Sequence, residues 1–187
     1  MNQIRPNTRD AIIEAAFQTF SGDPGASLAD VAERAGVGRA TLHRHFKGRD
    51  DLMVALAHAA ISELDEAVDA ATADAESYSE ALRISLAAII PLADRQWFLA
   101  HEPVDHNPEI KAAYQRQLGE LAEAIDAAKA EGSFSRDIPT GWIVQAFDHL
   151  TYAAWESVRA GESTASQAAS LAWRTLTTGL GVTSDDR

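Results

Sequence analysis

Hydrophobic residues recur at helical spacing along nearly the whole chain, and no stretch alternates apolar and polar residues for long enough to predict a strand. The first stripe has the i, i+3, i+4, i+7 spacing of an amphipathic helix: Ile13, Ala16, Phe17 and Phe20. Thr8 lies before this stripe as its predicted N-cap, and the turn-forming residues 21–25 end the helix. The chain therefore begins with one well-defined amphipathic helix.

Two short helices are predicted next. Ser27 and Asp30 are spaced as a capping-box pair at the start of the first one. A Gly-Val-Gly turn at 36–38 separates it from the second helix, in which Leu42 and Phe46 lie four residues apart on one side. The spacing predicts a compact unit of three helices.

Longer apolar stripes follow residue 50 and predict the larger part of a helical fold. They predict helices over 52–73, 82–90, 96–101, 110–132, 138–160 and 163–180. Pro91 ends or kinks the second of these, because proline lacks the backbone N–H that a helix interior needs. Tyr114 and Phe147 lie within regular stripes and are expected in the core. The whole pattern predicts an all-α protein of about nine helices.

Composition limits the class of protein. Of the 187 residues, 46% are hydrophobic and 24% are charged, as in ordinary globular proteins. The chain has no cysteine, which excludes disulfides, thiolate metal sites and cysteine nucleophiles. No apolar run is long enough to cross a bilayer, and residues 1–8 have no signal-peptide pattern. We therefore expect a cytoplasmic protein that does not bind membranes.

The net charge of −12 is unevenly distributed. Residues 1–50 contain seven Lys/Arg against six Asp/Glu, whereas residues 51–187 contain nine against 22, a net charge of −13. Four of the first seven basic residues fall between Arg39 and Arg49. This segregation indicates a small anion-binding end joined to a large acidic part.

Residues 27–46 have the pattern of a helix-turn-helix, with glycine in the turn because the chain must reverse sharply. With Leu42 and Phe46 packed inward, the other side of the second helix faces outward and fits the major groove of DNA. Arg39 suits guanine O6 and N7, and Thr41 suits a base edge. Other side chains suit phosphate oxygens: His43, His45, Lys47 and Arg49.

The stretch GASLADVAERAGVGRATLHRHFKGRDDL, which runs from Gly25 to Leu52, resembles the N-terminal domain of tetracycline-repressor (TetR) family regulators. The resemblance covers residues 8–56. It implies that Ser27 caps the second helix beside a DNA phosphate and that Arg39 and Ala40 lie nearest the bases. The candidate DNA-binding residues are Ser27, Arg39, Ala40, Thr41, His43, Arg44, His45, Lys47 and Arg49. His43 and Arg49 replace an aromatic residue and a lysine that most members of the family carry.

The resemblance also implies two domains, a helix-turn-helix DNA-binding domain over 1–50 and a ligand-binding and dimerisation domain over 51–187. It implies a homodimer joined through the last two helices. Two-fold symmetry then requires double-stranded DNA with a pseudo-palindromic operator. The remaining implied partner is a small-molecule effector, and the segment from 50 to 73 connects its domain to the DNA-binding domain.

Aromatic residues with polar tips mark the expected effector site. Such side chains line small-molecule pockets, but they also pack in helical cores, and both interpretations stay open for each residue. The candidates are Trp97, His101, Trp142, His149, Tyr152 and Trp155. The three candidates nearest the C-terminus are preferred, because they lie off the stripe that contains Phe147.

We expect no catalytic residues, no metal site and no cofactor. His101 and His106 are one residue too far apart for the HExxH motif, and Pro103 prevents a regular helix between them. The chain has no phosphate-binding glycine loop and no serine elbow. The sequence therefore predicts a DNA-binding transcriptional regulator, a repressor released by a small molecule. The alternative is a helical ligand-binding or enzymatic protein that no longer reads DNA.

Overall fold

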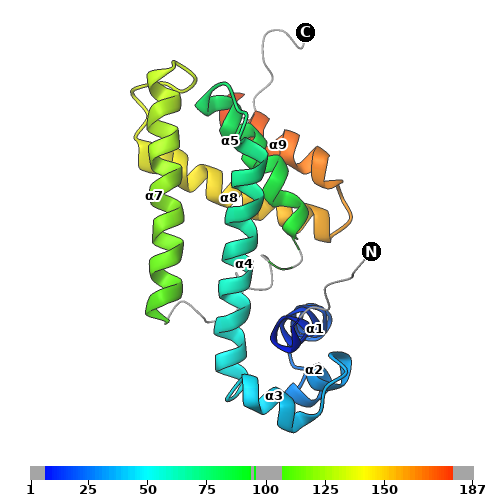
Figure 1. The fold of residues 1–187 in the computed structure, drawn as a ribbon. Helices are drawn as coiled ribbons and strands as arrows, with labels where there is room; N and C mark the ends of the chain where they lie inside the picture. Colours follow the sequence, from blue (N-terminus) through cyan, green and yellow to red (C-terminus); the bar gives the residue numbers. More distant parts are fainter. Residues whose placement is uncertain (1–6, 94, 96–106, 179–187) are drawn as a thin grey trace.

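The computed structural model describes residues 7–93, 95 and 107–178 (Figure 1). These residues form eight α-helices, one short 3-10 helix and no strand, which confirms the predicted all-α class. The helices are α1 (Thr8–Gly22), α2 (Leu28–Arg34), α3 (Arg39–His45), α4 (Arg49–Thr72), α5 (Tyr78–Ile89), η1 (Ile90–Leu92), α7 (Pro108–Ala130), α8 (Thr140–Arg159) and α9 (Ala165–Thr178). The helix predicted over 96–101 lies outside the described residues.

Side-chain caps fix the starts of the first two helices. The Asn7 side chain accepts a hydrogen bond from the Asp10 backbone N–H at 3.0 Å, so Asn7 is the N-cap of α1. The prediction of Thr8 as the cap is wrong, because the asparagine one position earlier takes this role and Thr8 becomes the first helical residue. Ser27 caps α2 as predicted, and it forms a capping box with Asp30.

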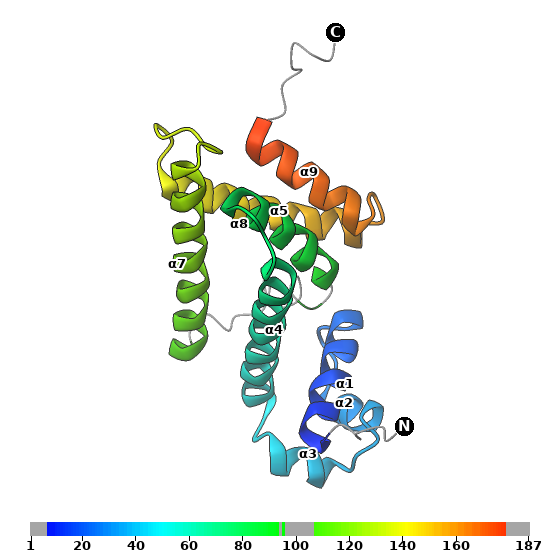
Figure 2. The same cartoon turned by 45° about the horizontal axis from the view of Figure 1, so that its top comes forward.

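The first hydrophobic core joins α1, α2, α3 and the first half of α4, and we call residues 7–60 the head. Its largest fully buried side chains are Ile12, Phe17, Phe20, Val31, Leu42, Phe46, Leu52 and Leu56. The two short helices lie at one end of the molecule, below α1 in Figure 1, and in Figure 2 α3 is lowest while α2 lies beside the lower half of α1. Helices as short as α2 and α3 are unstable alone, so this core holds them in place.

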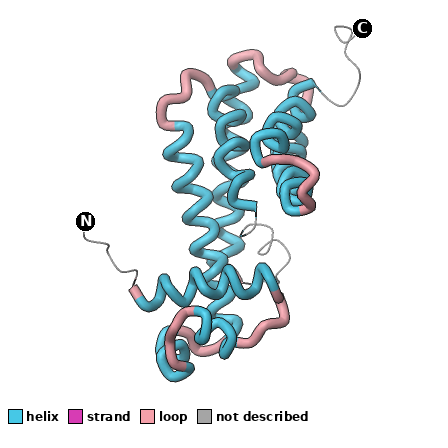
Figure 3. The backbone as a smooth tube through the Cα atoms, turned by 90° about the vertical axis from the view of Figure 1, so that its right-hand side faces the viewer, coloured by secondary structure: helices cyan, strands magenta, loops and turns pink. Residues whose placement is uncertain are grey.

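The second core lies among α5, α7, α8 and α9, and we call the described residues from 61 onward the body. Its members include Leu82, Leu86, Ile89, Ile90, Ile125, Ile143, Phe147 and Ala172. α8 and α9 pack side by side, and α7 runs alongside α4 (Figures 1 and 3). α4 belongs to both parts, because its residues up to Ala60 pack in the head while Leu64 and Val68 pack against the body. The division between residues 50 and 51 stays a prediction.

Two expectations about single side chains have opposite outcomes. Phe147 is buried as predicted, at 6% exposure, but Tyr114 is 45% exposed and its expected place in the core is wrong. The Tyr114 hydroxyl remains near the surface, where it donates to the Asp148 carboxylate on α8 at 3.1 Å. Partial burial, followed by the charge and hydrogen bond of Asp148, raises the pKa of Tyr114 to about 12. A phenol that keeps a polar partner favours such a boundary position over the dry core.

Pro91 has the predicted effect on the helix that precedes it. The regular α-helix ends at Ile89, and the proline lies inside the 3-10 helix that follows. Among the described residues, no helix is both long enough and apolar enough to span a membrane.

Candidate DNA interface

The turn between α2 and α3 depends on one glycine. Gly36 has φ +67°, a left-handed conformation that costs a residue with a side chain free energy, and Val37 N–H then donates to Ala32 C=O at 3.0 Å. Gly38 instead has φ −73° and is the N-cap of α3, a backbone conformation open to other residues. Only the first glycine of the predicted pair is therefore required by the backbone.

One side of α3 is packed into the head and the other side is free. Leu42 and Phe46 are each 1% exposed, as the four-residue spacing predicts. The candidate contact residues of α3 lie on the other side, and all are exposed except the half-buried Thr41: Arg39, Ala40, His43, Arg44 and His45. The helix forms the lower end of the molecule in Figure 1. This geometry leaves a cationic helix accessible to a large partner.

The start of α2 lies beside this helix and is organised by Ser27. The Ser27 hydroxyl and backbone N–H each donate to the Asp30 carboxylate at 2.7 Å. These hydrogen bonds, helped by the charge of Arg39, hold the pKa of Asp30 below its ordinary value. Ser27 is exposed, so its hydroxyl lies at the surface beside the amides of the first turn of α2.

Two residues of α3 already contact each other. Arg44 Nη2 donates to Thr41 Oγ1 at 2.9 Å. The guanidinium therefore lies beside the residue that the sequence assigns to a base edge, and the two side chains form one surface.

Lys47 and Arg49, which the sequence groups together, have different surroundings. Lys47 has an exposed side chain, and its backbone N–H donates to the Asp51 carboxylate at 2.9 Å. Arg49 is half-buried and donates to the carbonyls of Pro24 and Ala26, at 2.6 and 2.8 Å. Its guanidinium also lies 4.2 Å from the centre of the Phe20 ring. The structure places the Arg49 side chain against Phe20 and the loop before α2 rather than among the exposed cations.

Comparison with known proteins decides which family this helix-turn-helix represents. The family model for bacterial regulatory proteins of the tetR family matches residues 12–56. The HTH-type transcriptional repressor LfrR of Mycolicibacterium smegmatis (strain ATCC 700084 / mc(2)155) is 31% identical over 158 residues, which are 84% of this chain and 82% of LfrR. The chain belongs to the TetR family of bacterial regulatory proteins.

Solved TetR-like structures agree over nearly the full chain. The crystal structure of LfrR from Mycobacterium smegmatis in complex with proflavine has a TM-score of 0.80 and 29% identity, covering 94% of this chain and 97% of that one. Another crystal structure of LfrR has a TM-score of 0.63 and 26% identity, covering 92% and 99%. As a TetR family member, the chain is a DNA-binding transcriptional regulator, as the sequence predicts.

Of the predicted effector residues that the structure describes, Trp142 lies apart from Trp155. Trp142 is 72% exposed near the start of α8, whereas Trp155 is half-buried and its indole N–H donates to Ile89 C=O at 3.2 Å. Thirteen residues of helix separate them by about 20 Å, too far for one small ligand. His149 is exposed, with Nδ1 2.8 Å from Gln145 C=O, and Tyr152 is half-buried. Trp97 and His101 lie outside the described residues.

A cleft between α1 and α4 was not predicted from the sequence. It has a volume of about 430 Å³ and is lined by Arg9, Asp10, Ile13, Glu14, Ala55, His58, Ala59 and Arg95. Arg95 pairs with Glu14 of α1 at 2.5 Å and with Glu63 of α4 at 3.5 Å, and its guanidinium lies 4.8 Å from the centre of the Phe17 ring. These residues are far apart in sequence and carry no shared motif, so no sequence signal points to this junction.

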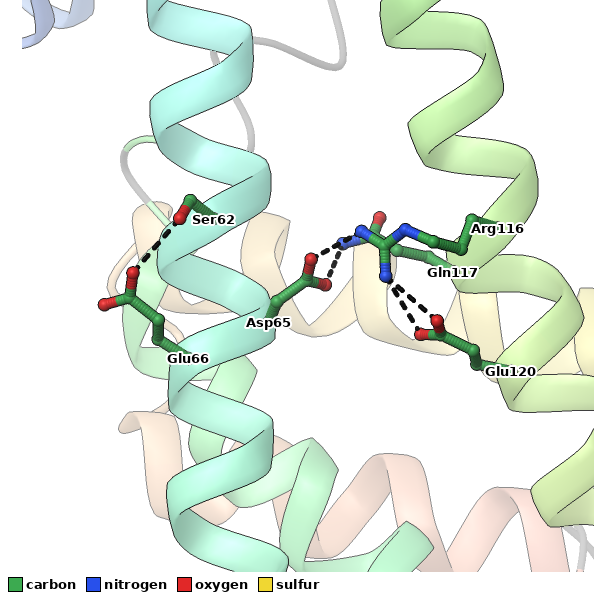
Figure 4. A network of polar contacts seen from close by, with 6 residues as sticks. All are labelled: Ser62, Asp65, Glu66, Arg116, Gln117 and Glu120. Carbon is green, nitrogen blue, oxygen red and sulfur yellow. Dashed lines mark hydrogen bonds and ion pairs between the residues drawn. The ribbon is translucent and has the colours of Figure 1, made fainter.

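Polar contacts join α4 to α7 at the level of the body. Asp65 accepts hydrogen bonds from Arg116 Nη2 at 2.6 Å and from Gln117 Nε2 at 2.7 Å (Figure 4). Earlier in α4, within the head, His58 Nε2 lies 3.5 Å from the Glu109 carboxylate. Within the described part of the chain, no three His, Asp or Glu side chains are placed to hold a metal ion.

Proposed function

We propose that this protein is a dimeric repressor that inserts α3 into the major groove of a pseudo-palindromic operator and releases it on binding a small molecule. The observation that carries this proposal is the exposed, cationic face of α3 opposite two fully buried residues, Leu42 and Phe46. A helix held in this way can enter the major groove without losing its contacts to the head.

The side chains of α3 differ in the DNA groups that they suit. Arg39, at the N-terminal end, can donate two hydrogen bonds to guanine, and Ala40 and Thr41 can contact neighbouring base edges. Phosphate oxygens suit four other exposed donors of this surface: His43, Arg44, His45 and Lys47. Ser27 can join them only if its hydroxyl leaves the Asp30 carboxylate. With three or four phosphate contacts per chain, log K against log salt for the dimer should slope at about −5 to −7.

The dimer proposal rests on α8 and α9. TetR regulators bind DNA and typically act as dimers, and here α8 and α9 expose apolar side chains: Trp142 is 72% exposed and Leu171 is 46% exposed. A four-helix bundle from two such pairs would remove them from water. Two-fold symmetry would then present two copies of α3 about one helical turn of DNA apart.

The effector that we propose is a flat aromatic cation. The structure of LfrR that this chain resembles contains proflavine, a planar aromatic dye. In this chain, the net charge of −13 over 51–187 attracts cations, and rings such as those of Tyr152 and Trp155 can bind them through their faces. Such a ligand releases DNA only if it binds one conformation of the dimer better than the DNA-bound conformation. In that conformation the distance between the two heads does not fit the operator.

α4 is the proposed connection between ligand and head. It packs in both cores, and Arg95 of the body pairs with α1 and with α4 at their junction. A ligand that shifts the body near Arg95 would therefore tilt α1 and α4 together. That tilt would change the distance between the two copies of α3.

The test uses DNA that the wild-type protein selects from a randomised duplex library. Arg39→Ala should cost about 1–3 kcal/mol on the selected site and relax the preference at one base pair. Arg136→Ala is the matched control, because Arg136 is exposed in the loop between α7 and α8, at the end of the molecule far from α3 (Figure 1). If both variants weaken binding to the selected site equally, Arg39 does not read a base. Failure of the wild-type protein to select any sequence would favour the alternative, a ligand-binding protein that does not read DNA.

A further inference from the structure

Arg49 is the first residue of α4, and its side chain turns back into the head. Its two terminal nitrogens donate to the carbonyls of Ala26 and Pro24, at 2.8 and 2.6 Å. Its flat face lies 4.2 Å from the centre of the Phe20 ring, which is 0% exposed. The guanidinium is thus held by two backbone oxygens and one buried ring.

The positions of these partners matter because they enclose the helix-turn-helix. Ala26 is the residue before the N-cap of α2, and Arg49 follows α3 by four residues. The contact therefore joins the two ends of the segment 27–48, which contains α2, the turn and α3. A second contact lies between the end of α3 and the start of α4, where the Asp51 carboxylate accepts a hydrogen bond from the Lys47 backbone N–H at 2.9 Å. Both contacts fix how α3 meets α4.

We propose that Arg49 is a positioning residue for DNA reading and not a phosphate ligand. It ties the start of α4 to the loop before α2, so that α2 and α3 keep one orientation and follow α4 when α4 tilts. The terminal nitrogens of Arg49 that could bind a phosphate already donate to carbonyl oxygens. If the guanidinium turned toward DNA, both carbonyls would lose a hydrogen bond and the Phe20 ring would lose its stacked partner. This inference rests on the proposed function, since it concerns how the same helix reads DNA.

The exchange of Arg49 for lysine separates the two roles. A lysine serves a phosphate nearly as well as an arginine, because both supply a positive charge. A lysine cannot reproduce two carbonyl hydrogen bonds together with stacking on a ring. We therefore expect both Arg49→Lys and Arg49→Gln to weaken binding to the selected operator by about tenfold or more.

Salt dependence gives the second readout, with Lys47→Gln as the matched control. Lys47 is exposed, so its loss should reduce the slope of log K against log salt by about 0.9 per chain and weaken operator and random-sequence DNA alike. The Arg49 variants should keep the wild-type slope and lose operator binding more than random-sequence binding. The thermal denaturation midpoint of each variant is measured first, so that the DNA titrations are run at a temperature at which the head is folded.

A variant outside the DNA surface provides a third test. Phe20→Leu removes the ring under the guanidinium but cannot itself touch DNA, because Phe20 is fully buried. Phe20→Leu should lower the ratio of operator to random-sequence affinity, and its effect should not add to that of Arg49→Lys, because the two side chains act through one contact. Should both Arg49 variants fail to fold, this ratio in Phe20→Leu decides the matter, and an unchanged ratio refutes the proposal.

Three results would overturn the role of Arg49. These are wild-type operator affinity in Arg49→Lys, a slope in Arg49→Gln that falls as far as in Lys47→Gln, and equal losses on operator and random-sequence DNA. None of these would affect the DNA-binding function, which fails only if the wild-type protein selects no site. The two failures are therefore distinguishable in one set of titrations.

Discussion

The head and α7 hold α4 by different kinds of contact. In the head, α4 contributes Leu52 and Leu56 to a core where both are 0% exposed. Against α7, the same helix uses polar groups at the surface, with Asp65 bonded to Arg116 and Gln117 (Figure 4). Buried apolar packing is costly to disrupt, whereas exposed ion pairs contribute little free energy. The difference indicates that α4 moves with the head and shifts more easily against α7.

The largest expected effect breaks the head core itself. Phe46→Ala should lower the free energy of unfolding by about 3–5 kcal/mol, because a fully buried aromatic side chain leaves a cavity. DNA binding should be lost with it, since Phe46 holds α3. Denaturant unfolding followed by circular dichroism measures the loss. Tyr78→Ala, at a position that is 51% exposed, is the control and should stay within about 0.5 kcal/mol. Similar losses in both variants would contradict the description of the head core.

The next effect concerns the turn of the helix-turn-helix. Gly36→Ala should destabilise the protein by about 1–3 kcal/mol, because alanine must adopt φ +67° there. Gly38→Ala is the matched control two residues away, where φ is −73° and a Cβ would meet nothing within 4 Å. Thermal denaturation of the two variants side by side makes the comparison. A larger loss in the Gly38 variant would show that the turn is held differently.

A smaller effect is expected at the cap of α2. Ser27→Ala should cost about 1 kcal/mol, because an amide of the first turn loses its acceptor. The effect should depend on pH through Asp30, whose pKa is lowered in the folded protein. A lowered folded pKa adds stability above the ordinary value of 3.8, and this stability is lost as the pH falls through the folded value. Unfolding curves of wild type and Asp30→Asn should therefore converge in acid, and a constant difference down to low pH would refute the role of the carboxylate.

The smallest expected effect tests the polar contact between α4 and α7. Arg116→Gln removes the link from α7 to Asp65 and should leave the free energy of unfolding close to the wild-type value, because exposed ion pairs contribute little. Arg83→Gln, which removes an ion pair to Glu80 within α5, should change it as little. Hydrogen exchange should then rise along the α4–α7 contact in Arg116→Gln only. A loss as large as that of Phe46→Ala would mean that α7 holds α4 as firmly as the head does.

Local signals in the sequence were sufficient for most of the head. Glycine at position 36 and the Ser27–Asp30 spacing give the turn and the cap directly, because these features depend on backbone conformation within a few residues. The Leu42–Phe46 spacing likewise gives the buried side of α3. Tyr114 was misplaced for the opposite reason, since its helical stripe does not reveal that Asp148 lies across from it on α8.

Long-range contacts account for what sequence reasoning missed at the site. Arg49 belongs to the basic run by sequence, yet its guanidinium meets carbonyls more than twenty residues away in the chain. Arg95 and Glu14 are 81 positions apart and pair at the junction of head and body. Trp142 and Trp155 share one helix and one chemical type, but only Trp155 has its indole N–H bonded to α5.

The sequence by itself determined the helices, the helix-turn-helix and the outward cationic side of α3, because periodicity, turn chemistry and capping act over short distances. Only the tertiary structure decided which cations are free, which aromatic rings are covered, and where head and body touch. Those outcomes depend on which helices become neighbours, because an arginine can donate hydrogen bonds to a phosphate, a carboxylate or a backbone carbonyl. The tertiary structure determines the partner of each such residue and therefore its role.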